Sequence, residues 1–292
     1  MGRGTKDEDE VVSGDAYLGP QEIRQLAESI GLTPTKKLGQ NFVHDANTVR
    51  KIVGLARLSP REHVLEIGPG LGSLTMGLIS QGAKVTVIEI DERLASLLPQ
   101  TIQRHYPGAH LTVLHQDALK VREISPDITS VVANLPYNTS VPIVLHLLEI
   151  APSVKKVLVM VQAEVAERLA ASPGSKVYGA PSVKAAWYGT WSVAGSVSRQ
   201  VFWPVPNVDS LLVSMEATEH PGDESLRTLV FELVDHAFAT RRKMVRGALA
   251  QLLGPQAHDL IRQAGLNPED RGEDWSVQDF VALARVIRDH RS

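Results

Sequence analysis

The sequence predicts an α/β fold, a largely parallel sheet with helices on both faces, followed by a small all-helical domain. The first observation is that short apolar runs typical of strands alternate with helical periodicity from residue 64 to residue 171. Such alternation indicates parallel strands joined by crossover helices. The second observation is that only helical periodicity remains after a polar segment at 216–225. A chain of 292 residues can hold one large and one small domain.

The expected elements follow one another in a regular order. Two short helices, with a polar loop at 36–42 between them, are expected at 21–30 and 44–56. Strands of the parallel sheet are expected at 64–67, 84–89, 110–115, 129–134 and 157–161, and their helices at 72–81, 91–105, 139–150 and 163–171. Two further strands, at 191–197 and 210–215, predict an antiparallel pair at the sheet edge. The C-terminal helices are expected at 225–239, 243–253, 256–264 and 276–289.

These patterns divide the chain into an acidic tail (1–20), an α/β domain (21–217) and a helical domain (218–292). The tail holds two basic and five acidic residues, which account for the whole net charge of −3. We expect it to be disordered, and the neutral remainder can still present a basic face. The chain has no cysteine, and its ten histidines show no metal-ligand spacing, so we expect neither disulfides nor a metal.

The composition also bears on location. No run of 18 apolar residues exists, and the N-terminus lacks the apolar stretch of a secretory signal. We therefore expect a cytoplasmic protein without a membrane span.

A glycine-rich turn follows the first strand of the sheet, at Gly68, Gly70 and Gly72. Glycines let the backbone approach a ligand closely, although a plain tight turn has the same composition. Glu89 ends the next strand, 21 positions after Gly68, where an acidic residue can bind ribose hydroxyls. Open α/β sheets bind ligands at the carboxyl ends of their strands, so the pair favours a nucleotide-like cofactor.

The glycine spacing distinguishes between two cofactor classes. The third glycine of a dinucleotide fingerprint would fall at position 73, which is Ser73, and Pro69 removes an N–H donor from a loop meant to hold pyrophosphate. S-adenosylmethionine has no phosphate and does not need that donor set. Asp117 can accept a hydrogen bond from an adenine amino group, or simply cap a loop or helix. The spacing favours S-adenosylmethionine over NAD.

The tetrapeptide Asn134-Leu135-Pro136-Tyr137 stands at the end of the apolar run 128–133. The Asn134 side-chain oxygen and the carbonyl of Leu135 or Pro136 can accept hydrogen bonds from an amino group on a flat ring. Pro136 stiffens the turn, and Tyr137 offers a ring for stacking. A polar turn at a strand end is the alternative.

Taken together, the motifs resemble those of the KsgA-type small-subunit (16S) rRNA adenine N6-dimethyltransferase family. The matching segments cover about residues 36–285, namely 39–42, 65–75, 89–91, 116–119, 134–138, 161–168, 173–179, 202–210 and 238–243. The resemblance implies a Rossmann-like class I methyltransferase sheet in the α/β domain. It also implies the cofactor S-adenosyl-L-methionine and two methyl transfers to N6 of each of two adjacent adenines in 16S rRNA.

The family resemblance also implies roles for individual residues. Cofactor contacts are expected from the glycines and strand-end residues, with the surrounding loops: Gln40, Asn41, Val43, Gly68, Gly70, Gly72, Glu89, Ile90, Asp117, Ala118 and Asn134. The target adenine is expected at Asn134, Leu135, Pro136 and Tyr137, with Phe202 nearby. RNA contacts are expected from a basic cluster in the helical domain: Arg241, Arg242, Lys243 and Arg246.

The expected partner is 16S rRNA within an immature small ribosomal subunit, bound by a monomer. Two other functions remain open. One is a large-subunit rRNA adenine methyltransferase of the antibiotic-resistance type, which shares the Asn-x-Pro-Tyr motif. The other is a non-catalytic RNA-binding assembly factor, against which the intact Glu89 and Asn134–Tyr137 argue.

Overall fold

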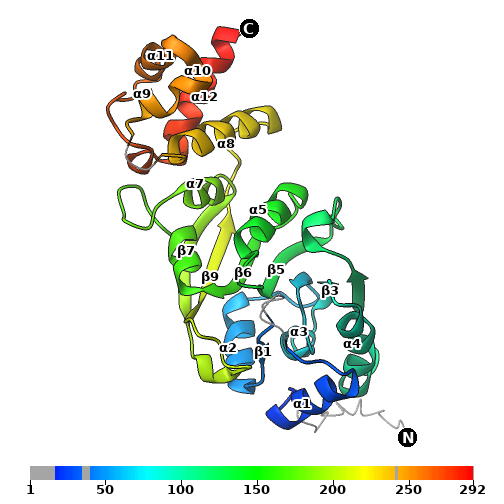
Figure 1. Cartoon of the computed structure of the whole chain (residues 1–292). Coiled ribbons are helices and arrows are strands. Elements are labelled where there is room, and N and C mark those ends of the chain that lie inside the picture. Colours follow the sequence, from blue (N-terminus) through cyan, green and yellow to red (C-terminus); the bar gives the residue numbers. More distant parts are fainter. Residues whose placement is uncertain (1–16, 35–39, 241–242, 292) are drawn as a thin grey trace, which may run out of the picture.

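A seven-stranded sheet forms the centre of the protein in the computed structural model, which describes residues 17–34, 40–240 and 243–291 (Figure 1). The strands lie in the order β4 (Leu111–His115), β3 (Lys84–Glu89), β2 (His63–Ile67), β5 (Ile128–Asn134), β6 (Lys156–Gln162), β9 (Ser210–Ala217) and β7 (Gly189–Val197). The first five are parallel, and β9 runs antiparallel to both of its neighbours. The predicted fold class and the antiparallel edge pair are confirmed.

Helices cover both faces of this sheet because successive strand side chains point to opposite faces. Val64 packs into the core under one face, and Leu65 packs into the core under the other. The helices over the Val64 face are α1 (Pro20–Ser29), α2 (Ala46–Ala56), α3 (Ser73–Ser80) and α4 (Glu92–His105). Those over the Leu65 face are α5 (Ser140–Ile150), α6 (Ala163–Leu169) and α7 (Ala180–Ala186).

Short polar side chains fix where the helices next to the glycine turn begin. Asp45 accepts a hydrogen bond from the Thr48 amide at 2.7 Å, which caps α2. Asp91 accepts one from the Arg93 amide at 3.0 Å and caps α4. Each carboxylate pairs with an amide that has no partner within its helix and complements the positive end of the helix dipole. The chain therefore leaves β3 and enters α4 at a defined point beside Glu89.

Five helices of the described chain form a lobe at one end of the molecule, drawn from yellow to red in Figure 1. They are α8 (Glu224–Phe238), α9 (Val245–Ala248), α10 (Ala250–Leu253), α11 (Ala257–Gln263) and α12 (Val277–Arg291). The apolar core of the lobe is continuous with the core on the Leu65 face of the sheet. Arg227 of α8 adds a polar link, because its guanidinium donates to Glu149 of α5 at 2.8 Å. The lobe therefore packs directly against the α/β part and is not joined to it by a linker alone.

Four local expectations differ from the structure. Strand β1 (Phe42–Val43) begins at the last position of the loop expected at 36–42 and pairs with β8 (Phe202–Trp203), and neither strand was expected. Helix α7 was also missed. The helix expected at 243–253 is two short helices, α9 and α10, with a turn at Leu249 between them. Strand β9 continues to Ala217, inside the segment expected to be polar linker, because Lys156 on β6 still pairs with Glu216.

Among the described residues, no helix has the length and apolar character needed to cross a bilayer.

Candidate active site

A cavity of about 280 Å³ lies at the carboxyl ends of the central parallel strands. It opens where β2 passes into the glycine turn and where β3 and β5 end, which is the ligand-binding edge of an open α/β sheet. Ten of the eleven residues expected to contact a cofactor line it: Gln40, Asn41, Val43, Gly68, Gly70, Glu89, Ile90, Asp117, Ala118 and Asn134. The structure thus brings together positions that lie far apart in the sequence.

Gly72 is the expected cofactor residue that the cavity lining does not include. It precedes α3 with a φ of 98°, in the left-handed region that favours glycine. A Cβ atom at this position would lie 2.7 Å from Cδ1 of Leu98 on α4. The tight turn and helix packing therefore explain this glycine, and the lining as observed does not support a direct contact with a cofactor.

Glu89 holds the glycine turn in place from the neighbouring strand. Its Oε2 accepts a hydrogen bond from the Gly70 amide at 3.3 Å, and its Oε1 accepts one from the Asp91 amide at 2.9 Å. The carboxyl group is buried, and burial raises its pKa while these two backbone donors lower it. A carboxylate has about four acceptor sites, so it can bind ribose hydroxyls while keeping these contacts.

A second buried carboxyl group, that of Glu66, also lines the cavity and was missed from the sequence. It is 1% exposed, and its Oε2 accepts a hydrogen bond from the Thr75 hydroxyl at 2.6 Å. Burial raises the pKa of Glu66 to about 8, and the nearby negative charge of Glu89 adds to that rise. An acidic residue inside the otherwise apolar run 64–67 was the signal that could have revealed it.

Asp117 caps a turn, which is one of the two roles that the sequence left open, and it also lines the cavity. Its Oδ1 accepts a hydrogen bond from the Leu119 amide at 3.0 Å and caps the 3₁₀ turn Ala118–Lys120. Its Oδ2 lies 4.0 Å from Nζ of Lys120. The two alternatives are therefore compatible, because a capping carboxylate still has acceptor sites directed away from the turn.

Asn134 is oriented by the loop before β1. Its side-chain Nδ2 donates a hydrogen bond to the carbonyl oxygen of Asn41 at 3.1 Å. This contact assigns the nitrogen to the Asn41 side, and Oδ1 is the side-chain atom that can accept a hydrogen bond from a ligand. The Leu135 amide donates to the Met160 carbonyl of β6 at 3.0 Å, which fixes the backbone that follows.

Tyr137 and Phe202, both expected near the target adenine, do not line the cavity at the glycine turn. The Tyr137 hydroxyl lies 2.8 Å from Oγ of Ser210, the first residue of β9, and burial raises the pKa of this tyrosine. Phe202 is buried in the core and pairs with Val43 across β8 and β1, which ties it to the strand that follows Asn41. The contact to Ser210 was missed, because it joins segments 73 residues apart.

The basic cluster is only partly described. Arg241 and Arg242 lie outside the described residues, and Lys243 is exposed. Arg246 is in the four-residue helix α9, and its guanidinium lies 3.7 Å from the Glu269 carboxylate. Helix α9 begins at Val245, so Lys243 precedes the helix that carries Arg246.

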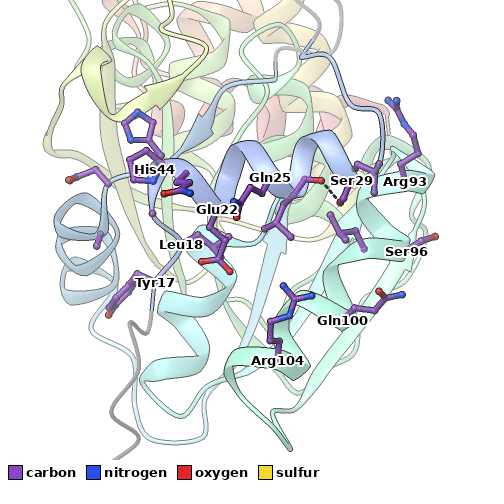
Figure 2. A pocket seen from close by; sticks show the side chains of 18 of the residues that line it. Tyr17, Leu18, Glu22, Gln25, Ser29, His44, Arg93, Ser96, Gln100 and Arg104 are labelled. Atoms are coloured by element: carbon purple, nitrogen blue, oxygen red, sulfur yellow. Dashed lines mark hydrogen bonds between the residues drawn. The ribbon is translucent and has the colours of Figure 1, made fainter.

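A larger hollow of about 1440 Å³ lies between α1, α4 and the start of α2. Figure 2 shows Gln25 and Ser29 of α1 opposite Ser96, Gln100 and Arg104 of α4. Within the described part of the chain, it shares no lining residue with the cavity at the glycine turn, and no residue expected to bind cofactor, adenine or RNA lines it. The larger hollow therefore lacks the strand ends and the buried carboxyl groups that make the cavity at the glycine turn the candidate active site.

Comparison with known proteins determines the family. The model of the family described as ribosomal RNA adenine dimethylase matches residues 32–289. The chain belongs to this family. As a ribosomal RNA adenine dimethylase it is an S-adenosylmethionine-dependent methyltransferase that acts on adenines of ribosomal RNA.

Full-length relatives and solved structures agree with this assignment. A protein of Leifsonia xyli subsp. xyli named ribosomal RNA small subunit methyltransferase A is 59% identical over 273 residues, covering 91% of this chain and 97% of the relative. A protein of the same name in Streptomyces coelicolor is 51% identical, covering 92% and 96%. A dimethyladenosine transferase from Plasmodium falciparum has the same fold, with a TM-score of 0.70, 24% identity and 83% and 95% coverage. The 23S rRNA methyltransferase ErmE gives a TM-score of 0.65 at 26% identity, with 85% and 100% coverage.

The cavity of this dimethylase fits the cofactor of the family. S-adenosylmethionine carries a sulfonium cation and no phosphate. Among the described residues that line the cavity none is Lys, Arg or His, whereas Glu66, Glu89 and Asp117 are acidic. A site built to hold pyrophosphate would use basic side chains or backbone donors, and Pro69 contributes no amide. The lining therefore suits a cationic ligand with ribose hydroxyls better than a dinucleotide.

Proposed function

We propose that this dimethylase transfers methyl groups from S-adenosylmethionine to N6 of two adjacent adenines in 16S rRNA of the small ribosomal subunit. The observation that carries the proposal is the orientation of Asn134. Its Nδ2 is hydrogen-bonded to the Asn41 carbonyl at the rim of the cofactor cavity, and its Oδ1 is presented to an incoming amine. The high identity to small-subunit methyltransferases over almost their full length supports the choice of subunit.

The residues at the strand ends would hold the cofactor next to this amide. Glu89 would bind the ribose hydroxyls, and Asp117 would accept a hydrogen bond from the adenine amino group of the cofactor. The turn at Gly68 and Gly70 would leave room for the methionine portion of the cofactor. The cofactor, when bound, would supply a methyl group activated by a sulfonium, so that in-line attack by the amine would form a C–N bond as the C–S bond breaks and a neutral thioether leaves. The chain contributes orientation and the exclusion of water, which are the main protein contributions to such a reaction.

Two acceptors hold the N6 amine of the target adenine. Asn134 Oδ1 is one of them. The Pro136 carbonyl already accepts a hydrogen bond from the Thr139 amide at 3.3 Å, which favours the Leu135 carbonyl as the second. Both hydrogens of the amine then point at acceptors, and its lone pair is directed toward the methyl group. A strong base is not required, because the methylated amine is acidic and loses its proton to water.

Tyr137 stacks on the adenine after the base has left the RNA stack. Its hydroxyl lies 2.8 Å from Oγ of Ser210, a contact that adds stability, while the ring provides the stacking surface. A second methyl transfer to the same nitrogen requires the monomethylated amine to turn and bind again at the same acceptors.

The helical lobe supplies RNA contacts from Lys243 and Arg246, with Arg241 and Arg242 as further members of the cluster. The substrate is an immature small subunit in the cytoplasm, and the enzyme acts as a monomer during ribosome assembly. The contact of Arg246 with Glu269 spans 3.7 Å between exposed groups, so phosphate can replace it at little cost.

A direct test compares two substrates. Small subunits and large-subunit RNA, both from cells that lack adenine dimethylation, are incubated with the enzyme and S-adenosylmethionine labelled in the methyl group. Incorporation into small subunits alone is expected. Incorporation into large-subunit RNA would instead support an enzyme of the antibiotic-resistance type, a possibility raised by the similarity to ErmE. Cofactor binding without any incorporation would indicate a non-catalytic assembly factor.

A further inference from the structure

Two exposed valines stand on the loop between β8 and β9. Val205 is 58% exposed and Val208 is 41% exposed. Both are large apolar side chains on a loop that carries Pro204 and Pro206, whose rings restrict the backbone. The two valines lie three positions apart, so this short loop presents two exposed apolar side chains within one segment.

An arginine outside the loop holds its backbone in a fixed shape. Arg199 donates from Nε to Oδ1 of Asp209 at 2.7 Å and from a terminal nitrogen to the Asn207 carbonyl at 3.0 Å. The other terminal nitrogen lies 3.4 Å from Oδ2 of Asp209, which completes a two-pronged ion pair. The Asp209 carbonyl in turn accepts from the Ala163 amide at 2.9 Å. The valines are therefore presented by an ordered loop, and the arginine beside it is already engaged.

Both ends of the loop lie at the proposed adenine site. Before it, Phe202 and Trp203 of β8 pair with Val43 and Phe42 of β1, next to the segment that orients Asn134. After it, Ser210 contacts the Tyr137 hydroxyl. The loop that carries the two valines therefore joins two segments that both contact the proposed adenine site.

We propose that Val205 and Val208 form an apolar wedge that enters the RNA stack where the target adenine leaves it. The inference rests on the proposed function, since it requires an adenine held at Asn134 and Tyr137. An extruded base leaves two neighbouring bases with exposed faces, and apolar side chains inserted there cover those faces. The partner is thus the pair of bases that flank the target. Phosphate contact does not suit the loop, because its exposed side chains are uncharged apart from the paired Asp209.

The test uses the double variant Val205→Ser/Val208→Ser, with Val193→Ser as the matched control. Val193 is 46% exposed on the edge strand β7, so the control removes a similar apolar surface away from the site. Base extrusion is followed by the fluorescence of 2-aminopurine placed at the target position of a small-subunit RNA fragment. Methyl transfer is measured on undermethylated small subunits, and cofactor affinity by calorimetry.

We expect the double variant to lose most of the fluorescence increase and at least about tenfold in kcat/KM, the loss that misplacement of a reacting group readily causes. Cofactor affinity and the Val193→Ser enzyme should match the wild type. An RNA that lacks one base next to the target has less stacking to oppose extrusion, and it should restore much of the activity of the double variant. The conservative variant Val205→Ile/Val208→Ile should remain active.

Equal fluorescence and equal rates in the double variant would overturn the wedge while leaving the proposed function intact. A wild-type enzyme that neither extrudes the base nor methylates the subunit would overturn the proposed function and the wedge with it. Val205→Ala/Val208→Ala provides a second variant if the serine pair lowers the melting temperature.

Discussion

Replacing Glu66 with glutamine should make the stability of the ligand-free protein less sensitive to alkaline pH. Glu66 is buried behind the glycine turn, and burial raises its pKa from 4.5 to about 8. A carboxyl group with a raised pKa binds its proton more tightly in the folded than in the unfolded chain. Its contribution is therefore fully present below pH 4.5 and is lost as the pH rises toward 8. The amide of the Glu66→Gln variant is neutral at every pH and can still accept a hydrogen bond from Thr75.

The size of the effect follows from the two pKa values. Each pKa unit corresponds to about 1.4 kcal/mol. Because Glu66 releases its proton more readily in the unfolded chain, the unfolding free energy should fall by about 2 kcal/mol between about pH 6 and pH 8 through this one residue. Denaturant titrations of wild type and Glu66→Gln at both pH values measure this difference, and Glu62→Gln serves as a control carboxyl with a lowered pKa. Parallel losses in wild type and Glu66→Gln would refute the burial of an ionisable carboxyl at this position.

Three further changes test other parts of the site. Glu89→Ala should weaken S-adenosylmethionine binding by about 1.5–3 kcal/mol, the range for hydrogen bonds to a charged group, and calorimetric titration showing unchanged affinity in a folded variant would remove Glu89 from the site. Tyr137→Phe should keep much of the activity because the ring remains, with a stability cost of about 1 kcal/mol for the lost contact to Ser210; inactivity with an unchanged melting curve would assign the hydroxyl a direct role. Reversing the charges of Lys243 and Arg246 should lower the slope of log affinity for RNA against log salt by about 0.7–0.9 per lost phosphate contact, while cofactor affinity is retained. An unaltered slope would show that the cluster is only a solvated surface.

Local patterns in the sequence were enough to predict the parallel sheet, and ten of the expected cofactor residues converge on one cavity at its edge. Gly68 and Glu89 follow separate apolar runs, and strand ends of a parallel sheet meet at one edge. The pairing of β1 with β8 was not predictable in this way. Each strand has two residues, and the partners Phe42 and Trp203 are far apart in the sequence, so neither shows a period of its own.

Side-chain roles within the site were harder to predict than its location. The position of Gly72 matched a motif, yet packing against Leu98 explains it. Glu66 was missed because the sequence does not show whether a single acidic side chain in an apolar strand is buried. Its burial depends on the helices that cover both faces of the sheet. The sequence predicted a stacking role for the Tyr137 ring. The contact of its hydroxyl with Ser210 was not predictable, because it depends on the placement of β9 beside β6.

Mass analysis of nucleosides from treated small-subunit RNA tests the central claim most directly. Undermethylated subunits are incubated with S-adenosylmethionine and either wild type or Asn134→Ala, with melting curves to establish that both are folded. The wild type should form N6,N6-dimethyladenosine through a monomethyl intermediate, and Asn134→Ala should be slower by about 10²-fold because the amine is no longer oriented. A 5-methylcytidine product, or full activity in Asn134→Ala, would contradict the account, and a reaction that stops at monomethyladenosine would refute dimethylation.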